Sequence, residues 1–145
     1  FKILLRKFMK LPHLDPILFV DSHAILDDKD ITAKYTVPHD HPVLKGHFPH
    51  FPIWPGIHLI EGCSQTAGLH AMHSVSTDID ENFVAMVASI DKVKFRRPVL
   101  PGDKLQYTAT LDKKKGSYMY YDCVVYNGGT RVAQAYVGLT ATKNG

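Results

Sequence analysis

The chain has 145 residues and a mass of 16.3 kDa, a length that favours one domain because one core usually serves roughly 100 to 200 residues. Its 45% hydrophobic and 21% charged content is that of a globular protein and excludes disorder, collagen and coiled coil. The net charge of +3 is too small and too dispersed for nucleic-acid binding, and it suits a moderately acidic partner. We predict a single domain over residues 1–145, with 1–10 as an N-terminal extension or short helix.

The sequence also indicates where the protein resides. The longest stretches without formal charge, 46–60 and 62–77, are separated by Glu61 and contain prolines and histidines, unlike the roughly 20 apolar residues of a membrane span. The apolar run at residues 3–5 is too short for a secretory signal. Cys63 and Cys123 lie 60 positions apart in apolar surroundings, which predicts two buried, reduced thiols. We expect a cytoplasmic protein without membrane contact.

The first third of the chain reads as a hairpin followed by a stiff loop. Residues 17–26 form an apolar, β-rich run, and 31–37 alternate apolar and polar residues across the turn-like segment 27–30. Residues 38–55 contain five prolines, which remove backbone donors and fix φ. We therefore predict an irregular but rigid loop before Gly56.

A long helix is expected from Gly56 to about Val75, with Pro55 at a favourable first-turn position. Its residues are apolar or small on every face. A helix of that kind is buried on all sides, because no face is polar enough to meet water. This pattern predicts a central helix enclosed by other structure.

Four strand-like runs follow the helix, separated by turn signals such as Asn127, Gly128 and Gly129. Apolar residues alternate with polar ones along 105–111, as in an antiparallel sheet with one packed face. The order of two strands, one helix and four strands predicts an α+β fold with about six antiparallel strands around one helix. The four predicted strands are 83–95, 104–111, 117–126 and 130–142.

Glu61 is the only formally charged residue between Lys45 and Asp78. Most helical glutamates lie on a solvated face, yet the neighbours of this one are apolar or small. Desolvation would raise the pKa of its carboxyl group and let it hold a proton near neutrality. Glu61 is therefore a candidate general acid.

His47 and Gly56 complete a possible proton-transfer site. His47 lies in a stiff corner before the proline-rich loop, and a histidine can act as a base near neutral pH. The first amides of a helix have no intrahelical acceptor, and a glycine there allows a carbonyl oxygen to approach. A base, an acid and an oxyanion donor within 15 positions suit proton abstraction next to a carbonyl.

These residues form part of a longer signature that resembles the FabZ-type (3R)-hydroxyacyl-[acyl-carrier-protein] dehydratases. The separation of 14 positions between His47 and Glu61 is that of the family, and similarity extends over roughly residues 11–142. Glutamate at position 61 points to FabZ, since the related FabA enzymes carry Asp. The motif consists of His47, Phe48, Pro49, Pro52, Pro55, Gly56, Glu61 and Gln65, with further matching segments at 11–21, 90–98 and 101–103.

The resemblance implies a hotdog fold, in which a curved antiparallel sheet wraps one long helix. It implies that His47 is the catalytic base, that Glu61 reaches the same pocket from the partner subunit, and that the Gly56 amide binds the thioester oxygen. Phe48, Trp54, Pro55 and Gln65 are the further substrate-binding candidates. The implied reaction converts (3R)-3-hydroxyacyl-[acyl-carrier-protein] into the trans-2-enoyl product in fatty-acid biosynthesis, without metal or organic cofactor. Acyl carrier protein is the implied partner, and the assembly a homodimer or a trimer of dimers.

Three residues depart from the family pattern: His50 stands where glycine is usual, Asp15 where tyrosine is common, and Trp54 where a smaller residue precedes Pro55. None of these changes removes a catalytic group. Trp54 and His50 could reshape the acyl tunnel. A specialised acyl or polyene pathway is therefore an alternative to primary fatty-acid synthesis.

Other functions remain open from the residues alone. A thioesterase is the nearest alternative because hotdog folds host both chemistries, and a non-catalytic acyl-chain binder is another. A metal site would use histidines whose spacing is not one that identifies zinc, namely His39, His41, His47, His50 and His58. The basic residues Lys92, Lys94, Arg96 and Arg97 fit a solvated strand face, part of which is a candidate docking site for the carrier protein.

Overall fold

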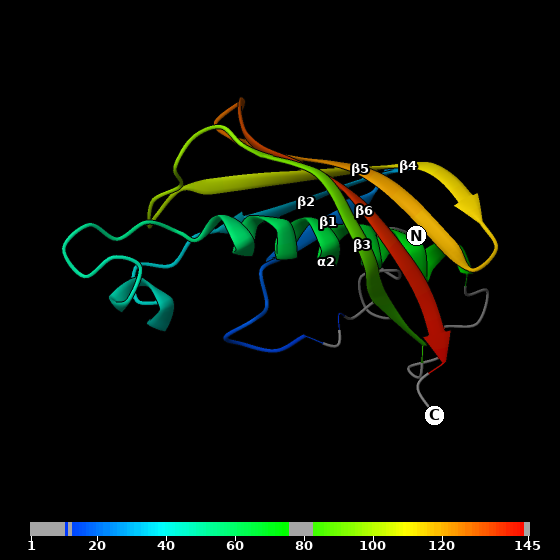
Figure 1. Cartoon of the computed structure of the whole chain (residues 1–145), viewed down its shortest axis with the longest axis horizontal. Coiled ribbons are helices and arrows are strands. Elements are labelled where there is room, and N and C mark those ends of the chain that lie inside the picture. The colour runs from blue at the N-terminus through cyan, green and yellow to red at the C-terminus, as the bar shows by residue number, and fades with distance from the viewer. Residues whose placement is uncertain (1–10, 12, 76–82, 144–145) are drawn as a thin grey trace.

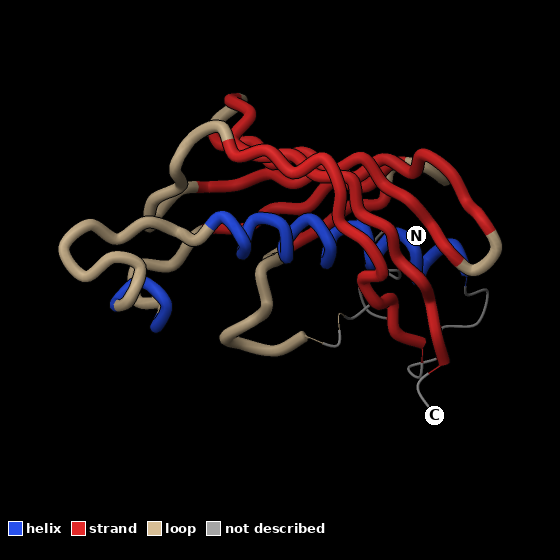
Figure 2. The backbone as a smooth tube through the Cα atoms, viewed as in Figure 1, coloured by secondary structure: helices blue, strands red, loops and turns tan. Residues whose placement is uncertain are grey.

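The structure is a computed structural model and describes residues 11, 13–75 and 83–143. One antiparallel sheet curves over the helix α2 (Gly56–Val75), and a short 3-10 helix η1 (Pro42–Lys45) lies in the loop before it (Figures 1 and 2). The six strands lie in the order β1-β2-β4-β5-β6-β3, so β3 forms one edge. Their bounds are β1 Ser22–Ile25, β2 Asp30–Thr36, β3 Phe83–Phe95, β4 Lys104–Lys115, β5 Tyr118–Asn127 and β6 Thr130–Lys143.

The core lies between the concave face of the sheet and α2. Alternate residues of β2 and β5 are buried, as the two-residue period of a strand requires. Every residue of α2 from 62 to 71 is buried, and the helix packs against five of the six strands. The predicted six-stranded α+β fold with one central helix is confirmed. Burial of the helix on every face holds for residues 62–71 and not for its first turn, where Ile57 is exposed.

Most element bounds agree with the sequence, and two differ for visible reasons. The first strand begins at Ser22 instead of residue 17, because the backbone at Ile17 and Phe19 bonds to the Gln65 side chain. Strand β4 runs on to Lys115 because its last residues pair with the start of β5.

The expected hairpin turns are present, with left-handed backbone at Gly128 (φ 57°) and Gly129 (φ 84°). Cys63 and Cys123 are buried and not joined by a disulfide, as predicted. No helix in the described ranges is long and apolar enough to span a bilayer. The predicted N-terminal extension, residues 1–10, lies outside the described residues.

Candidate active site

A cavity of about 520 Å³ opens at the N-terminal end of α2. Residues on both sides of the loop-to-helix junction line one wall, including His47, Ile53, Trp54 and Gly56. The opposite wall is the end of β3 and the turn after it, residues 95–99. We call this space the His47 cavity. Tertiary packing forms it, because its two walls are about 40 positions apart along the chain.

The imidazole of His47 is held in one orientation and is partly exposed to the cavity. Its Nδ1 lies 2.9 Å from the carbonyl oxygen of Ile53. Since a carbonyl can only accept, Nδ1 carries the hydrogen, and Nε2 of the neutral ring keeps a free lone pair. The ring of Phe48 stacks on that of His47 at a centroid distance of 4.4 Å. The sequence-predicted base is therefore in the tautomer that can accept a proton at Nε2.

Gly56 is the first residue of α2, and it also lines the cavity. A Cβ atom placed there would lie 2.7 Å from Cε1 of Phe95, a distance that real contacts do not allow. The glycine therefore permits the close approach of Phe95. Its amide belongs to the first turn, where N–H groups lack intrahelical acceptors and the positive end of the helix dipole is concentrated. An anionic oxygen in the cavity would be stabilised at this end.

Trp54 is both a cavity wall and a core residue. It lines the His47 cavity, yet its side chain is only 1% exposed. Its indole packs edge-on against Phe19, His41 and His58 at centroid distances of 5.5, 5.0 and 4.8 Å. Pro55 is buried and is not among the lining residues, and its carbonyl accepts a hydrogen bond from the His58 amide.

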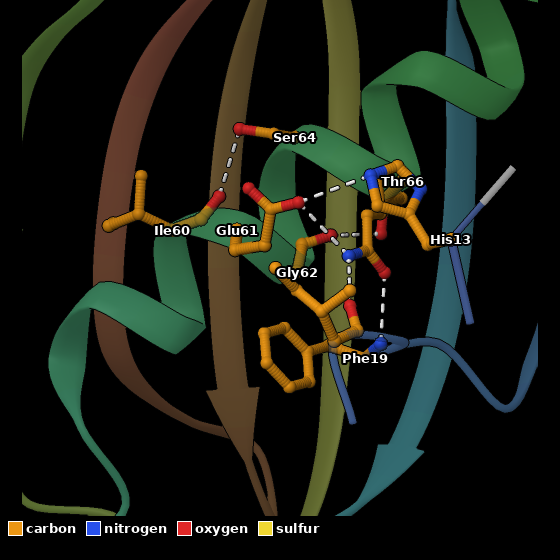
Figure 3. A network of polar contacts seen from close by, with 9 residues as sticks. His13, Phe19, Ile60, Glu61, Gly62, Ser64 and Thr66 are labelled. Atoms are coloured by element: carbon orange, nitrogen blue, oxygen red, sulfur yellow. Dashed lines mark hydrogen bonds and ion pairs between the residues drawn. The ribbon is translucent and has the colours of Figure 1, made fainter. Parts of the chain in front are cut away.

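Glu61 lies in a different polar network, shown in Figure 3. Its Oε1 accepts a hydrogen bond of 3.1 Å from Gln65 Nε2 and lies 3.3 Å from His13 Nε2. The side chain is 31% exposed, so a single chain does not desolvate the carboxyl group as fully as the sequence led us to expect. The reason is that α2 turns this position away from the concave face of the sheet, toward the segment that contains His13.

One chain does not bring the two proton-transfer candidates into one cavity. His47 lines the cavity at the start of α2, whereas Glu61 is absent from its lining within the part of the chain that the structure describes. Glu61 instead contacts the N-terminal segment.

The amide of Gln65 is fully engaged with the protein. Its Nε2 donates to the Ile17 carbonyl (2.7 Å) as well as to Glu61, and its Oε1 accepts from the Phe19 amide (2.9 Å). The side chain is 1% exposed. Gln65 therefore ties the N-terminal segment to α2 and orients Glu61, and it is not among the residues that line the His47 cavity.

The structure adds residues that the sequence reasoning did not select. His13 contacts Glu61 although 48 positions separate them, and no spacing pattern could have indicated this pair. Phe95 forms the cavity wall opposite Gly56. Their only sequence signal was membership of the segments that resemble the dehydratase family.

The histidines considered as metal ligands do not form a cluster. Among the described residues, no three His, Cys, Asp or Glu side chains come together in a way that could hold a metal ion. His41 uses both ring nitrogens within the protein, at Pro16 and at Val43. His58 stacks on Phe19, and burial lowers the pKa of its imidazole.

Solved structures share this architecture and define the class. The dehydratase heterocomplex ApeI:P from Xenorhabdus doucetiae superposes with a TM-score of 0.76 at 17% identity, covering 96% of this chain and 91% of that one. The thioesterase HI1161 from Haemophilus influenzae gives a TM-score of 0.61 at 14% identity, covering 83% and 77%. The protein therefore has the hotdog fold.

The family follows from the sequence comparisons. Residues 10–136 match the model of the FabA-like domain. A relative from a Nitratiruptor species, named 3-hydroxyacyl-[acyl-carrier-protein] dehydratase FabZ, is 43% identical over 129 residues, covering 86% of this chain and 87% of the relative. FabZ of Campylobacter curvus is 40% identical with the same coverage. The chain belongs to the FabA-like family, as a FabZ-like member.

Proposed function

We propose that this protein is a lyase that removes water from (3R)-3-hydroxyacyl-[acyl-carrier-protein] to form the trans-2-enoyl product in fatty-acid biosynthesis. Relatives named for the FabZ dehydratase, at 36 to 43% identity over most of the chain, support this function. The main structural support for this function is the His47 cavity, where a histidine with an open Nε2 faces a helix N-terminus. Those two groups are what proton abstraction next to a thioester carbonyl requires.

The residues have distinct roles in the proposed reaction. His47 Nε2 takes a proton from carbon 2, and the Gly56 amide stabilises the negative charge that develops on the thioester oxygen. A protonated Glu61 gives its proton, directly or through one water, to the departing hydroxyl on carbon 3, which leaves as water. Phe48 stacks on the base, and Trp54 shapes the cavity. The proposed reaction needs no metal or organic cofactor, because side chains transfer both protons and a backbone amide stabilises the negative charge on the thioester oxygen.

A homodimer would bring Glu61 to the cavity of its partner. The edge strand β3 has one neighbour in the sheet, and it exposes Val87, Ile90 and Phe95. An unpaired edge that carries apolar side chains is a surface suited to another chain. Ile57, beside the cavity, is 75% exposed. We propose that two copies associate across this surface, with further association to a trimer of dimers, and that each cavity takes its acid from the other copy.

The carrier protein would approach the arginine side of the cavity. Arg96 and Arg97 line the His47 cavity, and residues 91–98 are all exposed. Clustered arginines at an opening favour an acidic partner through charge complementarity. This placement supports the docking of acyl carrier protein at the end of β3.

A product assay on the purified protein tests this function. Hydroxyacyl carrier-protein substrates of increasing chain length are incubated with the protein, and enoyl product and free carrier-protein thiol are both measured. We expect enoyl product without thiol release. Thiol release would indicate a thioesterase, and substrate binding with neither product would indicate an acyl-chain binder. A narrow preference for unusual chains would favour a specialised pathway.

Mixing two inactive variants tests the shared cavity. In a dimer of His47→Ala with Glu61→Gln, one cavity carries both defects and the other carries none. Random pairing after joint refolding makes about half of the dimers mixed, which predicts roughly a quarter of wild-type activity. Each variant refolded alone stays inactive. If tagged mixed dimers are present and inactive, the acid and base come from one chain.

The domain assignment and the location of the protein are also proposals. The comparisons match most of the chain, which supports one hotdog dehydratase domain over residues 1–145. Two free, buried thiols suit a reducing compartment such as the cytoplasm. Fractionation of cells that express the native gene checks this location.

A further inference from the structure

Two nitrogen atoms contact the same oxygen of the Glu61 carboxyl group. Gln65 Nε2 donates to Oε1 at 3.1 Å, and His13 Nε2 lies 3.3 Å from Oε1. Oε2 has no partner among the residues that the structure describes. Figure 3 shows the His13 imidazole pointing at the carboxyl group. The two oxygens of Glu61 are therefore not equivalent.

The segment that carries His13 is held in place by α2. Gln65 donates to the Ile17 carbonyl at 2.7 Å and accepts from the Phe19 amide at 2.9 Å. Phe19 is itself 1% exposed and stacks on His58. These bonds hold the chain four and six positions after His13, and the His13 side chain is itself only 27% exposed beside Glu61.

The surroundings of His13 favour one tautomer. Its Nδ1 is buried and has no hydrogen-bond partner within the described part of the chain. A buried N–H donor without an acceptor is unfavourable, so the neutral ring with its hydrogen on Nε2 is preferred. That hydrogen points at Glu61 Oε1. Histidine and glutamine then both present N–H groups to one oxygen.

From this geometry we infer that His13 is a positioning residue for the acid of the proposed dehydration. With two N–H donors at Oε1, a protonated Glu61 carries its hydrogen on Oε2, the oxygen without a protein partner. His13 and Gln65 together thereby fix which oxygen delivers the proton and in which direction it points. The inference rests on the proposed function only for its catalytic consequence, since the tautomer and the contact are properties of the folded chain.

Kinetics of three variants tests the catalytic consequence. His13→Leu removes the N–H donor and keeps an apolar side chain, and we expect kcat to fall about tenfold with KM unchanged, because a misdirected acid slows proton transfer and not binding. His13→Gln keeps an N–H donor and should recover most of that loss. Leu14→Ala, a neighbouring residue that is 76% exposed, is the matched control and should retain wild-type kcat. Wild-type kcat in His13→Leu would overturn the inference.

A double-mutant comparison separates positioning from general support of the fold. In a Glu61→Gln background, single-turnover rates should be the same with and without His13→Leu, because His13 acts through the proton that Glu61 no longer delivers. A further loss as large as in the wild-type background would show that His13 acts elsewhere and would overturn the inference.

A measurement without any substrate keeps this inference separate from the proposed function. Nitrogen NMR of protein labelled at histidine reports which ring nitrogen carries hydrogen. We expect His13 to be protonated at Nε2 in the wild type, with a shifted Nε2 signal in Glu61→Gln. A hydrogen on Nδ1, or an Nε2 signal unaffected by Glu61→Gln, would refute the contact. Absence of enoyl product from the wild type would refute the dehydratase function and leave the NMR result standing.

Discussion

Two histidines near opposite ends of α2 differ in the number of hydrogen bonds that their rings make. In the C-terminal half, His70 is fully buried, with Nδ1 2.8 Å from the Tyr121 hydroxyl and Nε2 3.2 Å from the Asp27 carbonyl. Beside the N-terminal end, His47 uses Nδ1 at Ile53 and leaves Nε2 open to the cavity. A histidine with both nitrogens bonded holds a core together, whereas one with a single bonded nitrogen is oriented and still able to accept a proton.

Residue type does not distinguish a structural from a reactive side chain. His47 and His70 are both followed by an apolar residue along the chain, Phe48 and Ala71. What separates them is the number of protein partners that each ring finds after folding.

The largest effect is expected at His47, whose Nε2 has no protein partner in the described part of the chain. His47→Ala should lower kcat for dehydration by about 100-fold or more with an unchanged circular dichroism spectrum, because a positioned base typically contributes 10²- to 10⁴-fold. The enoyl assay measures the rate. Turnover near that of the wild type would remove His47 from the mechanism.

In the buried C-terminal half of α2, His70→Leu should lower the stability of the protein and leave its catalytic rate unchanged. The substitution leaves the Tyr121 hydroxyl buried without its partner, which lowers the free energy of unfolding by about 2 kcal/mol. Urea denaturation measures this loss. Activity per folded molecule should match the wild type, and a selective loss of kcat would show that the distinction between the two histidines is wrong.

Trp54 belongs both to the core and to the wall of the His47 cavity. Trp54→Met should shift the preferred acyl chain length by a factor of about ten between neighbouring substrates, since cavity volume changes and proton-transfer groups do not. It should also lower the free energy of unfolding by about 1 to 2 kcal/mol through lost aromatic packing. Rates on a ladder of chain lengths check the shift, and an unchanged profile would make Trp54 a core residue alone.

Alanine substitutions at two glycines of α2, Gly56 and Gly68, should have smaller effects and can be compared directly. At Gly56 a new Cβ would lie 2.7 Å from Phe95, so Gly56→Ala should displace the cavity wall and lower kcat/KM about tenfold. At Gly68 a Cβ would lie 3.6 Å from that of Ala85, an ordinary contact. Gly68→Ala should therefore leave activity unchanged and stabilise the helix by about 0.5 to 1 kcal/mol. Equal activity of the two variants would contradict the role given to Gly56.

The smallest effect is a change of stability with pH. Burial lowers the pKa of His70 below its ordinary value of 6.5. Below about pH 6.5 the unfolded state binds more protons than the native state. The contribution of His70 to the free energy of unfolding is therefore complete above that pH and decreases as the pH falls below it. His58, whose pKa burial also lowers, acts in the same direction. Between about pH 7.5 and 5.5 the wild type should lose more stability than His70→Leu, and an equal loss would refute the role of His70.

Local pattern was sufficient for the elements and for the family. The helix begins at Gly56 and ends at Val75 as expected, because Pro55 and the continuous apolar run act within the segment itself. The strands followed from alternation and from glycine turns, which are also local. The combined His47 and Glu61 motif indicated the FabZ-like family, and the comparisons confirmed it.

Tertiary structure decided which side chains meet. Only folding places Phe95 against Gly56, buries Trp54 among four aromatic rings, and brings His13 to Glu61. Most of these contacts join positions that are distant along the chain, and they depend on side-chain packing that no periodic pattern encodes. The same holds for Gln65, which the motif suggested for the substrate and which the fold uses to bind the N-terminal segment. Local sequence patterns were therefore sufficient to predict the fold class and the reactive residue types, whereas long-range packing set the burial and the partners of each reactive group.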